Sequence, residues 1–249
     1  MHKLTLIISA VFFASGAAAM AEGNKSVTAR GHSSYIYLEE SPDSLQILPP
    51  PPSFDSVEFL RDKAMYDWGK AQRNTPRGKL AWNDADVTEE NLAKGFSPAF
   101  GYEISKQNTP EIFKLIGTLE ADSGDLATRS AKQHYNRVRP FAFFKEPTCR
   151  PEDEKELLTN GSYPSGHTAT GWAVALVLAE INTERQNLIL KRGYEMGVSR
   201  GICGYHWQSD IEAGRLVAST SVNRLHASPE FQTQMQKAKN EFSHLKENK

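Results

Sequence analysis

The chain has 249 residues, of which 39% are hydrophobic and 10% aromatic, and this composition is enough for an ordinary hydrophobic core. Its formal net charge is −1, so the charge balance gives no reason to expect a nucleic-acid polymer or an acidic membrane surface as a partner. The length fits one large domain or two small ones.

The first residues have the pattern of a secretory signal peptide. Lys3 supplies a short basic start, residues 4–14 are an apolar run, and small residues continue to Ala21. The apolar run is too short to span a bilayer, and no later stretch reaches the length of a transmembrane helix. We therefore predict a signal peptide at residues 1–21, no membrane contact after its cleavage, and a mature protein that is periplasmic or secreted.

Residues 22–55 are predicted to form an irregular N-terminal segment. Within it, residues 35–38 could form one extended stretch. The four consecutive prolines at residues 49–52 require a polyproline II conformation and are interpreted as a strap that leads into the domain. A proline motif that binds a partner is the alternative interpretation.

Residues 56–249 are predicted to form one helical domain. Val57, Leu60, Ala64 and Trp68 recur at the spacing of one face of a helix. A second helical stretch is predicted over residues 80–96, with Asp86 or Thr88 as its cap. Further helices are predicted to begin at Pro110, Ser165 and Pro229 and to cover residues 122–138, 183–198 and 205–225. The sequence shows neither the alternation of β-strands nor an internal repeat, so the predicted fold class is all-α.

The chain contains two cysteines, Cys149 and Cys203. Two cysteines in an exported protein are expected to form a disulfide. Chain-entropy arithmetic for a loop of this size gives a stabilisation of at most about 4 kcal/mol. Two buried thiols are the alternative.

The first of three polar clusters is the pair Lys132 and Arg139, which lie seven residues apart and just before Pro140. On a continuous helix this spacing is close to two turns, so both side chains would point the same way. Two cations on one face suit an anion with several oxygens. The alternative is a solvated basic face, to which we assign Arg129 and Arg137.

The second cluster is the tetrapeptide at residues 164–167, which precedes an apolar helix. A helix N-terminus offers free N–H groups and a partial positive charge. The hydroxyl of Ser165 can cap the helix or donate to a ligand, Gly166 lets an anion approach the backbone, and His167 lies within reach of that anion. The alternative is a serine N-cap beside an incidental histidine.

The third cluster contains Arg200, His206 and Asp210. If the segment from residue 205 is helical, His206 and Asp210 lie on one face, because they are four residues apart. Asp210 could then accept the proton of one ring nitrogen of His206 and leave the lone pair of the other nitrogen free to attack. The alternative is an ordinary surface pair.

Together the three clusters supply cations, a helix N-terminus, two histidines and an orienting carboxylate, as phosphoryl transfer requires. His134, His167 and His206 do not have the spacing of metal ligands. The sequence therefore predicts no metal and no cofactor.

The three clusters, in this order and with these gaps, resemble the three-part signature of the acid phosphatase superfamily, which also contains vanadium haloperoxidases and lipid phosphatases. Other segments resemble the bacterial class A non-specific acid phosphatases, among them the Leu-Pro-Pro-Pro-Pro strap, Gly-Asp-Leu-Ala-Thr-Arg-Ser-Ala-Lys and Ile-Cys-Gly-Tyr-His-Trp-Gln-Ser-Asp. The resemblance covers nearly all of residues 40–245. Gly201 differs from the apolar residue that is commoner at its position, which concerns local packing only.

The resemblance implies an all-helical, exported and metal-independent phosphomonoesterase that is usually a homo-oligomer and is inhibited by inorganic phosphate or vanadate. It implies that His206 becomes phosphorylated, that His167 is the general acid and that Asp210 orients the nucleophile. The phosphate oxygens would be held by Lys132, Arg139, Ser165, Gly166 and Arg200.

The leading hypothesis is therefore a periplasmic acid phosphatase that hydrolyses small-molecule phosphate monoesters, with nucleotides as further substrates and phosphate transfer to alcohols as a side activity. A vanadate-dependent haloperoxidase is a second hypothesis. A third is an exported phosphate-binding protein without catalytic activity, which would explain the cations but not the pairing of His206 with Asp210.

Overall fold

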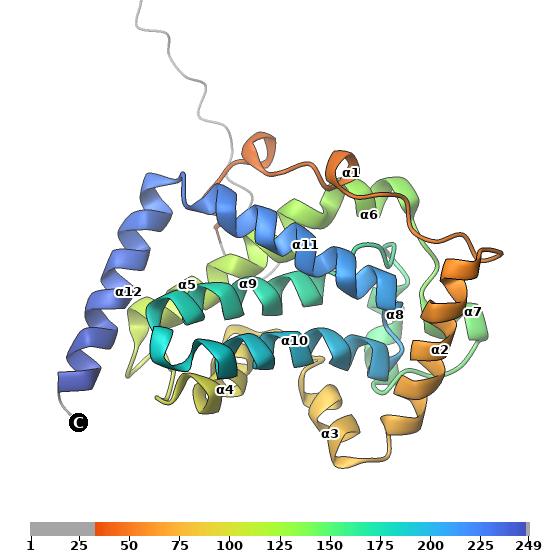
Figure 1. Cartoon of the computed structure of the whole chain (residues 1–249), viewed down its shortest axis with the longest axis horizontal. Helices are drawn as coiled ribbons and strands as arrows, with labels where there is room; N and C mark the ends of the chain where they lie inside the picture. The colour runs from red at the N-terminus through yellow and green to blue at the C-terminus, as the bar shows by residue number, and fades with distance from the viewer. Residues whose placement is uncertain (1–32, 248–249) are drawn as a thin grey trace, which may run out of the picture.

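The computed structural model describes residues 33–247, so the predicted signal peptide lies outside the described residues (Figure 1). The regular elements in this range are all helices, and none of residues 33–247 belongs to a β-strand. This confirms the all-α prediction. The longer helices are α2 (Val57–Gln72), α3 (Pro76–Asn83), α4 (Glu89–Phe100), α5 (Pro110–Leu119), α9 (Gly166–Ile181), α10 (Gln186–Cys203), α11 (Gln208–Leu225) and α12 (Pro229–Glu247). The shorter ones are η1 (Leu38–Glu40), α1 (Ser44–Ile47), η2 (Glu120–Asp125), η3 (Leu126–Thr128), α6 (Arg129–Tyr135), α7 (Pro140–Phe144), η4 (Pro151–Asp153), α8 (Glu154–Leu157) and η5 (Thr183–Arg185).

Helix α9 is the centre of the core, with α10 and α11 packed along it (Figure 1). Its residues are buried nearly all round, as the apolar sequence predicts. The α9–α10 contact is close: a Cβ on Gly193 would lie only 2.3 Å from the Cβ of Ala175, so only glycine fits there. Helices α4, α5 and α12 complete the main core at the end of α9 that is remote from Ser165.

Helix α2 forms where the spacing predicts it, but its regular apolar face points to solvent. Val57 is 76% exposed and Leu60 is 63% exposed. The buried face carries Phe59, Asp62 and Tyr66 and packs against α10 and α11. Two aromatic rings and one buried carboxylate therefore decide which side of α2 faces inward.

The prediction of one helix over residues 80–96 is wrong, because the chain breaks there into α3 and α4. The break places Asp84 in the interior, where its carboxylate pairs with Arg192 of α10. Thr88 caps α4 as expected, since its hydroxyl accepts the N–H of Asn91 at 3.4 Å.

The helix predicted over residues 122–138 is also interrupted. Residues 120–125 form the π-helical turn η2, and α6 ends at Asn136, whose φ of 38° is left-handed. Lys132 and Arg139 therefore do not share a helix.

Downstream, α10 continues to Cys203 and ends at Gly204, with φ of 79°, so His206 lies in the loop before α11.

The N-terminal segment is tied to the helical body. It contains the short helices η1 and α1, and η1 takes in Leu38, the last residue of the stretch expected to be extended. The carbonyl of Pro49 accepts the Tyr163 hydroxyl at 2.8 Å, and the carbonyl of Pro52 accepts Arg137 Nη2 at 3.3 Å. Cys149 and Cys203 are disulfide-bonded, which joins the loop after α7 to the end of α10.

None of the helices within residues 33–247 is both long enough and apolar enough to cross a membrane.

Candidate active site

The three polar clusters meet at a cavity of about 480 Å³ between α6, the start of α9 and the loop before α11. Five of the eight predicted site residues line it: Lys132, Arg139, Gly166, His167 and His206. The other three, Ser165, Arg200 and Asp210, are fully buried around it. The structure thus brings the predicted residues together, although the two helices that were expected to present them are interrupted.

Two of the cations in the site are held by neutral oxygens. Lys132 Nζ donates to the carbonyls of Gly161 at 3.1 Å and Pro164 at 2.8 Å. Arg139 donates through Nε to the carbonyl of Leu157 at 2.7 Å and through Nη2 to Asn160 Oδ1 at 2.6 Å. Burial lowers the pKa of Lys132 to about 7 and that of Arg139 to about 10. Since no carboxylate pairs with them in these contacts, their charge remains available to an anion.

Arg200 is the least satisfied cation in the site. It lies in the last turn of α10, is 1% exposed, and makes one long hydrogen bond, from Nη2 to the carbonyl of Ala81 at 3.3 Å. Within residues 33–247, its Nη1 has no hydrogen-bond partner. The guanidinium also lies over the ring of Tyr205, 5.5 Å from the centroid. Burial lowers its pKa to about 10, so it stays charged at neutral pH with one donor nitrogen free.

The start of α9 has the predicted N-cap. The Oγ of Ser165 accepts the N–H of Thr168 at 3.3 Å and its hydroxyl at 2.9 Å, so the Ser165 proton is still available to a ligand. A Cβ on Gly166 would lie 2.7 Å from the carbonyl oxygen of Gly124. Gly166 is therefore required for close packing against η2, a reason the sequence did not reveal.

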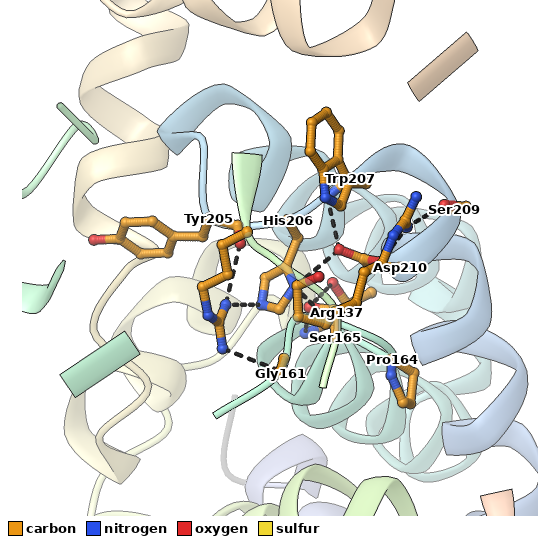
Figure 2. Close-up of polar contacts among 12 residues, drawn as sticks. Arg137, Gly161, Pro164, Ser165, Tyr205, His206, Trp207, Ser209 and Asp210 are labelled. Carbon is orange, nitrogen blue, oxygen red and sulfur yellow. Dashed lines mark hydrogen bonds and ion pairs between the residues drawn. The ribbon is translucent and has the colours of Figure 1, made fainter. Parts of the chain in front are cut away.

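The hydrogen bonds of His206 indicate its tautomer (Figure 2). Its Nε2 lies 3.2 Å from Arg139 Nη1, and arginine can only donate, so Nε2 is the acceptor and carries the lone pair. The proton is then on Nδ1, which donates to the carbonyl of Ser162 at 2.8 Å. The result is a histidine with its unprotonated nitrogen at the cavity.

The expected partner of His206, Asp210, is present but is not the nearest acceptor. Its Oδ2 lies 3.5 Å from His206 Nδ1, farther than the Ser162 carbonyl. The difference arises because His206 precedes the helix and Asp210 is in its first turn, where Oδ2 accepts the N–H of Trp207 at 2.8 Å. Burial raises the pKa of Asp210, while Arg137 and this N–H act to lower it.

Arg137 is the residue that sequence reasoning missed. We assigned it to a solvated face, which is wrong: it is 6% exposed, and its Nη1 donates to Asp210 Oδ1 at 2.6 Å. Its Nη2 donates to Asp62 Oδ2 of α2 at 2.8 Å. The signal that could have found it is Asn136, because asparagine favours the left-handed end of a helix and so separates Arg137 from the face of α6. By contrast, Arg129 pairs with Asp125 at 2.6 Å, and both side chains are partly exposed.

Comparisons with known proteins identify the family of the chain. The family model described as PAP2 superfamily matches residues 119–233, which include all three clusters. The chain is 54% identical to the non-specific acid phosphatase of Providencia stuartii over 248 residues, which are 99% of this chain and 100% of that protein. The chain belongs to the non-specific acid phosphatases of the PAP2 superfamily. It is also 48% identical over 82% of both chains to the non-specific acid phosphatase of Salmonella typhimurium (strain LT2), and 34% identical to the acid phosphatase of Zymomonas mobilis over 97% of this chain and 92% of that one.

Both histidines of the phosphatase are held neutral by their surroundings. Burial lowers the pKa of His206 well below its usual range, and Arg139 and Lys132 lower it further. Burial also lowers the pKa of His167 well below its usual range, with Arg200 as the next cause. Both shifts have the sign expected for an imidazole buried among cations.

Proposed function

We propose that this acid phosphatase hydrolyses small phosphate monoesters in the periplasm through a phosphohistidine at His206. The observation that carries the proposal is the tautomer of His206: its unprotonated Nε2 accepts Arg139 Nη1, in a cavity lined by Lys132 and Arg139. Such an environment attracts a phosphate dianion and presents a neutral nitrogen to its phosphorus.

The phosphate would be bound before any bond changes. Lys132, Arg139 and Arg200 supply charge, and Ser165 together with the N-terminus of α9 at Gly166 supplies hydrogen-bond donors. The free Nη1 of Arg200 and the hydroxyl proton of Ser165 are two donors of the site that residues 33–247 leave unused. The dianion offsets the surrounding positive charge and raises the pKa of His167, so that this residue becomes protonated in the complex.

The reaction then has two steps. In the first, His206 Nε2 forms a bond to phosphorus, the bond from phosphorus to the ester oxygen breaks, and His167 gives its proton to the leaving oxygen. In the second, water attacks phosphorus, His167 takes the proton of that water, and the N–P bond breaks to release phosphate. Asp210 stabilises the positive charge that His206 carries while it is phosphorylated.

The substrate class follows from the size and charge of the site. A cavity of about 480 Å³ accepts a phosphate with a small leaving group, and its mixed lining selects no single leaving group, as the name of the relatives suggests. Nucleotides and phosphate transfer to an alcohol in place of water are extensions of the same chemistry. Inorganic phosphate and vanadate would inhibit as occupants of the phosphate site. A homo-oligomer stays a prediction from the resemblance.

The test is to trap the intermediate and to separate the histidines by leaving group. Acid quench within milliseconds of mixing should leave phosphate on His206, and His206→Ala should form none and lose nitrophenyl and alkyl phosphate hydrolysis alike. His167→Ala should lose about 10²–10⁴-fold on an alkyl phosphate, whose leaving group needs a proton, but much less on nitrophenyl phosphate. A phosphoenzyme that persists in His206→Ala, or that maps to Ser165, would contradict the proposal.

A further inference from the structure

Arg137 connects two buried carboxylates that lie far apart in the sequence. Its Nη1 donates to Asp210 Oδ1 at 2.6 Å and to Ser209 Oγ at 2.7 Å, and its Nη2 donates to Asp62 Oδ2 at 2.8 Å. Asp62 in turn accepts the main-chain N–H of Ser209 at 2.8 Å and the Ser209 hydroxyl at 2.6 Å. Figure 2 shows Arg137, Ser209 and Asp210 close together, with Asp210 between them and His206 and Trp207 nearby.

This group is closed to solvent. Asp62 is 2% exposed and Asp210 is completely buried. The guanidinium of Arg137 lies over the rings of Phe54 and Trp207, 5.8 Å and 5.5 Å from their centroids, and the strap carbonyl of Pro52 covers Nη2. In such a dry environment a charge pair is strong and an unpaired carboxylate is costly, so each member depends on the others.

The two carboxylate oxygens of Asp210 have different partners. Oδ1 is held by Arg137, and Oδ2 is left to the N–H of Trp207 and to His206 Nδ1. A carboxylate held at one oxygen cannot rotate freely, so the direction of Oδ2 toward His206 depends on where Arg137 is held. Asp62 holds Arg137 from α2 and at the same time holds the first turn of α11, from which Asp210 projects.

We infer that Arg137, anchored by Asp62, is a positioning residue for the phosphatase reaction: it keeps Asp210 ionised and keeps Oδ2 directed at His206. The inference rests on the proposed role of His206 as the nucleophile. When Nε2 bonds to phosphorus, the imidazole becomes cationic, and an ionised Asp210 beside Nδ1 stabilises that charge. Because this stabilisation develops in the transition state, loss of Arg137 lowers kcat and leaves substrate binding nearly unchanged.

The effect on pH dependence has a defined sign. Loss of Arg137 removes the cation that opposes the effect of burial on Asp210, so Asp210 becomes protonated at a higher pH and the acidic limb of the kcat profile moves upward. Loss of Asp62 removes a negative charge from the group, so it does not move that limb upward. The titratable and charged groups that face Asp210 from the elements around it are Arg137, Asp62, His206, Lys132, Arg139 and Tyr163.

The experiment compares Arg137→Met, Arg137→Lys and Asp62→Asn with the matched control Glu241→Gln. Glu241 of α12 resembles Asp62 in that its carboxylate accepts main-chain N–H groups in the first turn of another helix, those of Glu111 and Ile112 at 3.1 Å and 3.0 Å, but it lies away from the cavity. All four variants are assayed on nitrophenyl phosphate for kcat, KM, the kcat–pH profile and trapped phosphoenzyme, and unfolded in urea.

We expect Arg137→Met and Asp62→Asn to lower kcat by about 10²-fold with KM within a factor of two, since a small misplacement of a catalytic group has a cost of this size. Only Arg137→Met should also move the acidic limb upward. Arg137→Lys should keep the limb closer to that of the native protein but lose kcat, because lysine keeps the charge without the two-pronged geometry. Glu241→Gln should lose stability alone.

The inference is overturned if Arg137→Lys and Asp62→Asn lose stability as Glu241→Gln does yet keep the native kcat and pH profile, which would make the group a scaffold only. These two variants keep the question answerable if Arg137→Met does not fold. Failure of the proposed function would look different, since native protein would then show no phosphate on His206.

Discussion

Two buried arginines near His206 have contrasting surroundings. Arg137, behind Asp210, has both terminal nitrogens bonded, and two of their acceptors are carboxylates. Arg200, which is buried behind the cavity lining, has a single long bond to a carbonyl, and its Nη1 has no partner within residues 33–247. The same chemical group is therefore paired with carboxylates in one region and left with an unused donor nitrogen in the other. Pairing with carboxylates, more than burial, distinguishes the two arginines, because Arg137 also has one nitrogen, Nε, without a hydrogen-bond partner within residues 33–247.

The largest expected effect concerns stability. Arg137→Met leaves Asp62 and Asp210 buried without their cation, which should lower the free energy of unfolding by about 3–5 kcal/mol. Arg200→Met removes a buried charge that has no carboxylate partner in these contacts, so the free energy of unfolding should stay the same or rise. Urea unfolding of the two variants measures this difference in unfolding free energy. Equal losses of unfolding free energy would contradict the predicted contrast between the two arginines.

The second effect concerns activity. Arg200→Met removes a donor that the protein leaves free for the phosphate, which should lower kcat/KM by about 10²–10³-fold. The matched control is Arg185→Met, because Arg185 also bonds only main-chain carbonyls, those of Ala99 and Pro98, but lies away from the cavity. An Arg200→Met variant as active as Arg185→Met would show that the free nitrogen has no part in catalysis.

The smallest expected effect concerns how anion affinity depends on pH through Lys132, a cation in the cavity whose pKa is lowered by burial. The pKa of Lys132 is about 7, below its usual value of 10.5, so Lys132 loses its charge as the pH rises above 7 in the ligand-free protein. Affinity for inorganic sulfate, whose own charge is constant, should therefore fall by up to about tenfold per pH unit between pH 7 and 9. In Lys132→Arg the slope should be nearly flat, as titration calorimetry can measure. An equal slope in both proteins would assign the titration to another group.

The same shift has a consequence for folding. Between pH 7 and 10.5 the unfolded chain keeps a proton on Lys132 that the folded chain has released. The free energy of unfolding that this residue contributes therefore rises with pH across that interval. Lys132→Met should remove this part of the pH dependence in urea unfolding, which separates it from the pH dependence of sulfate affinity.

The sequence was informative wherever the signal was local. Ser165 caps α9, Thr88 caps α4 and Pro229 begins α12, because capping and proline geometry involve only neighbouring residues. The three polar clusters also met as predicted, since each one lies at the end of an element that faces the cavity.

What the sequence did not reveal depends on contacts between distant residues. Arg137 and Asp62 are 75 positions apart, and no periodicity connects them. The Ser162 carbonyl that orients His206 is a main-chain group, which a pattern of side chains cannot show. The interruption after Asn136 places Arg137, which the sequence analysis assigned to a solvated face, in the interior, and its single local signal was the asparagine itself.

The inverted placement of α2 has a practical meaning for protein engineering. A prediction based on hydrophobicity alone would place Val57 and Leu60 in the core. With α2 in that orientation, Asp62 would face the solvent. In the observed orientation, α2 leaves apolar side chains exposed and places the Asp62 carboxylate against Ser209 and Arg137. The outer face of α2 can therefore be redesigned for solubility. Polar replacements at Val57 and Leu60 are expected to leave kcat unchanged, whereas even a conservative change at Asp62 on the inner face is expected to lower kcat.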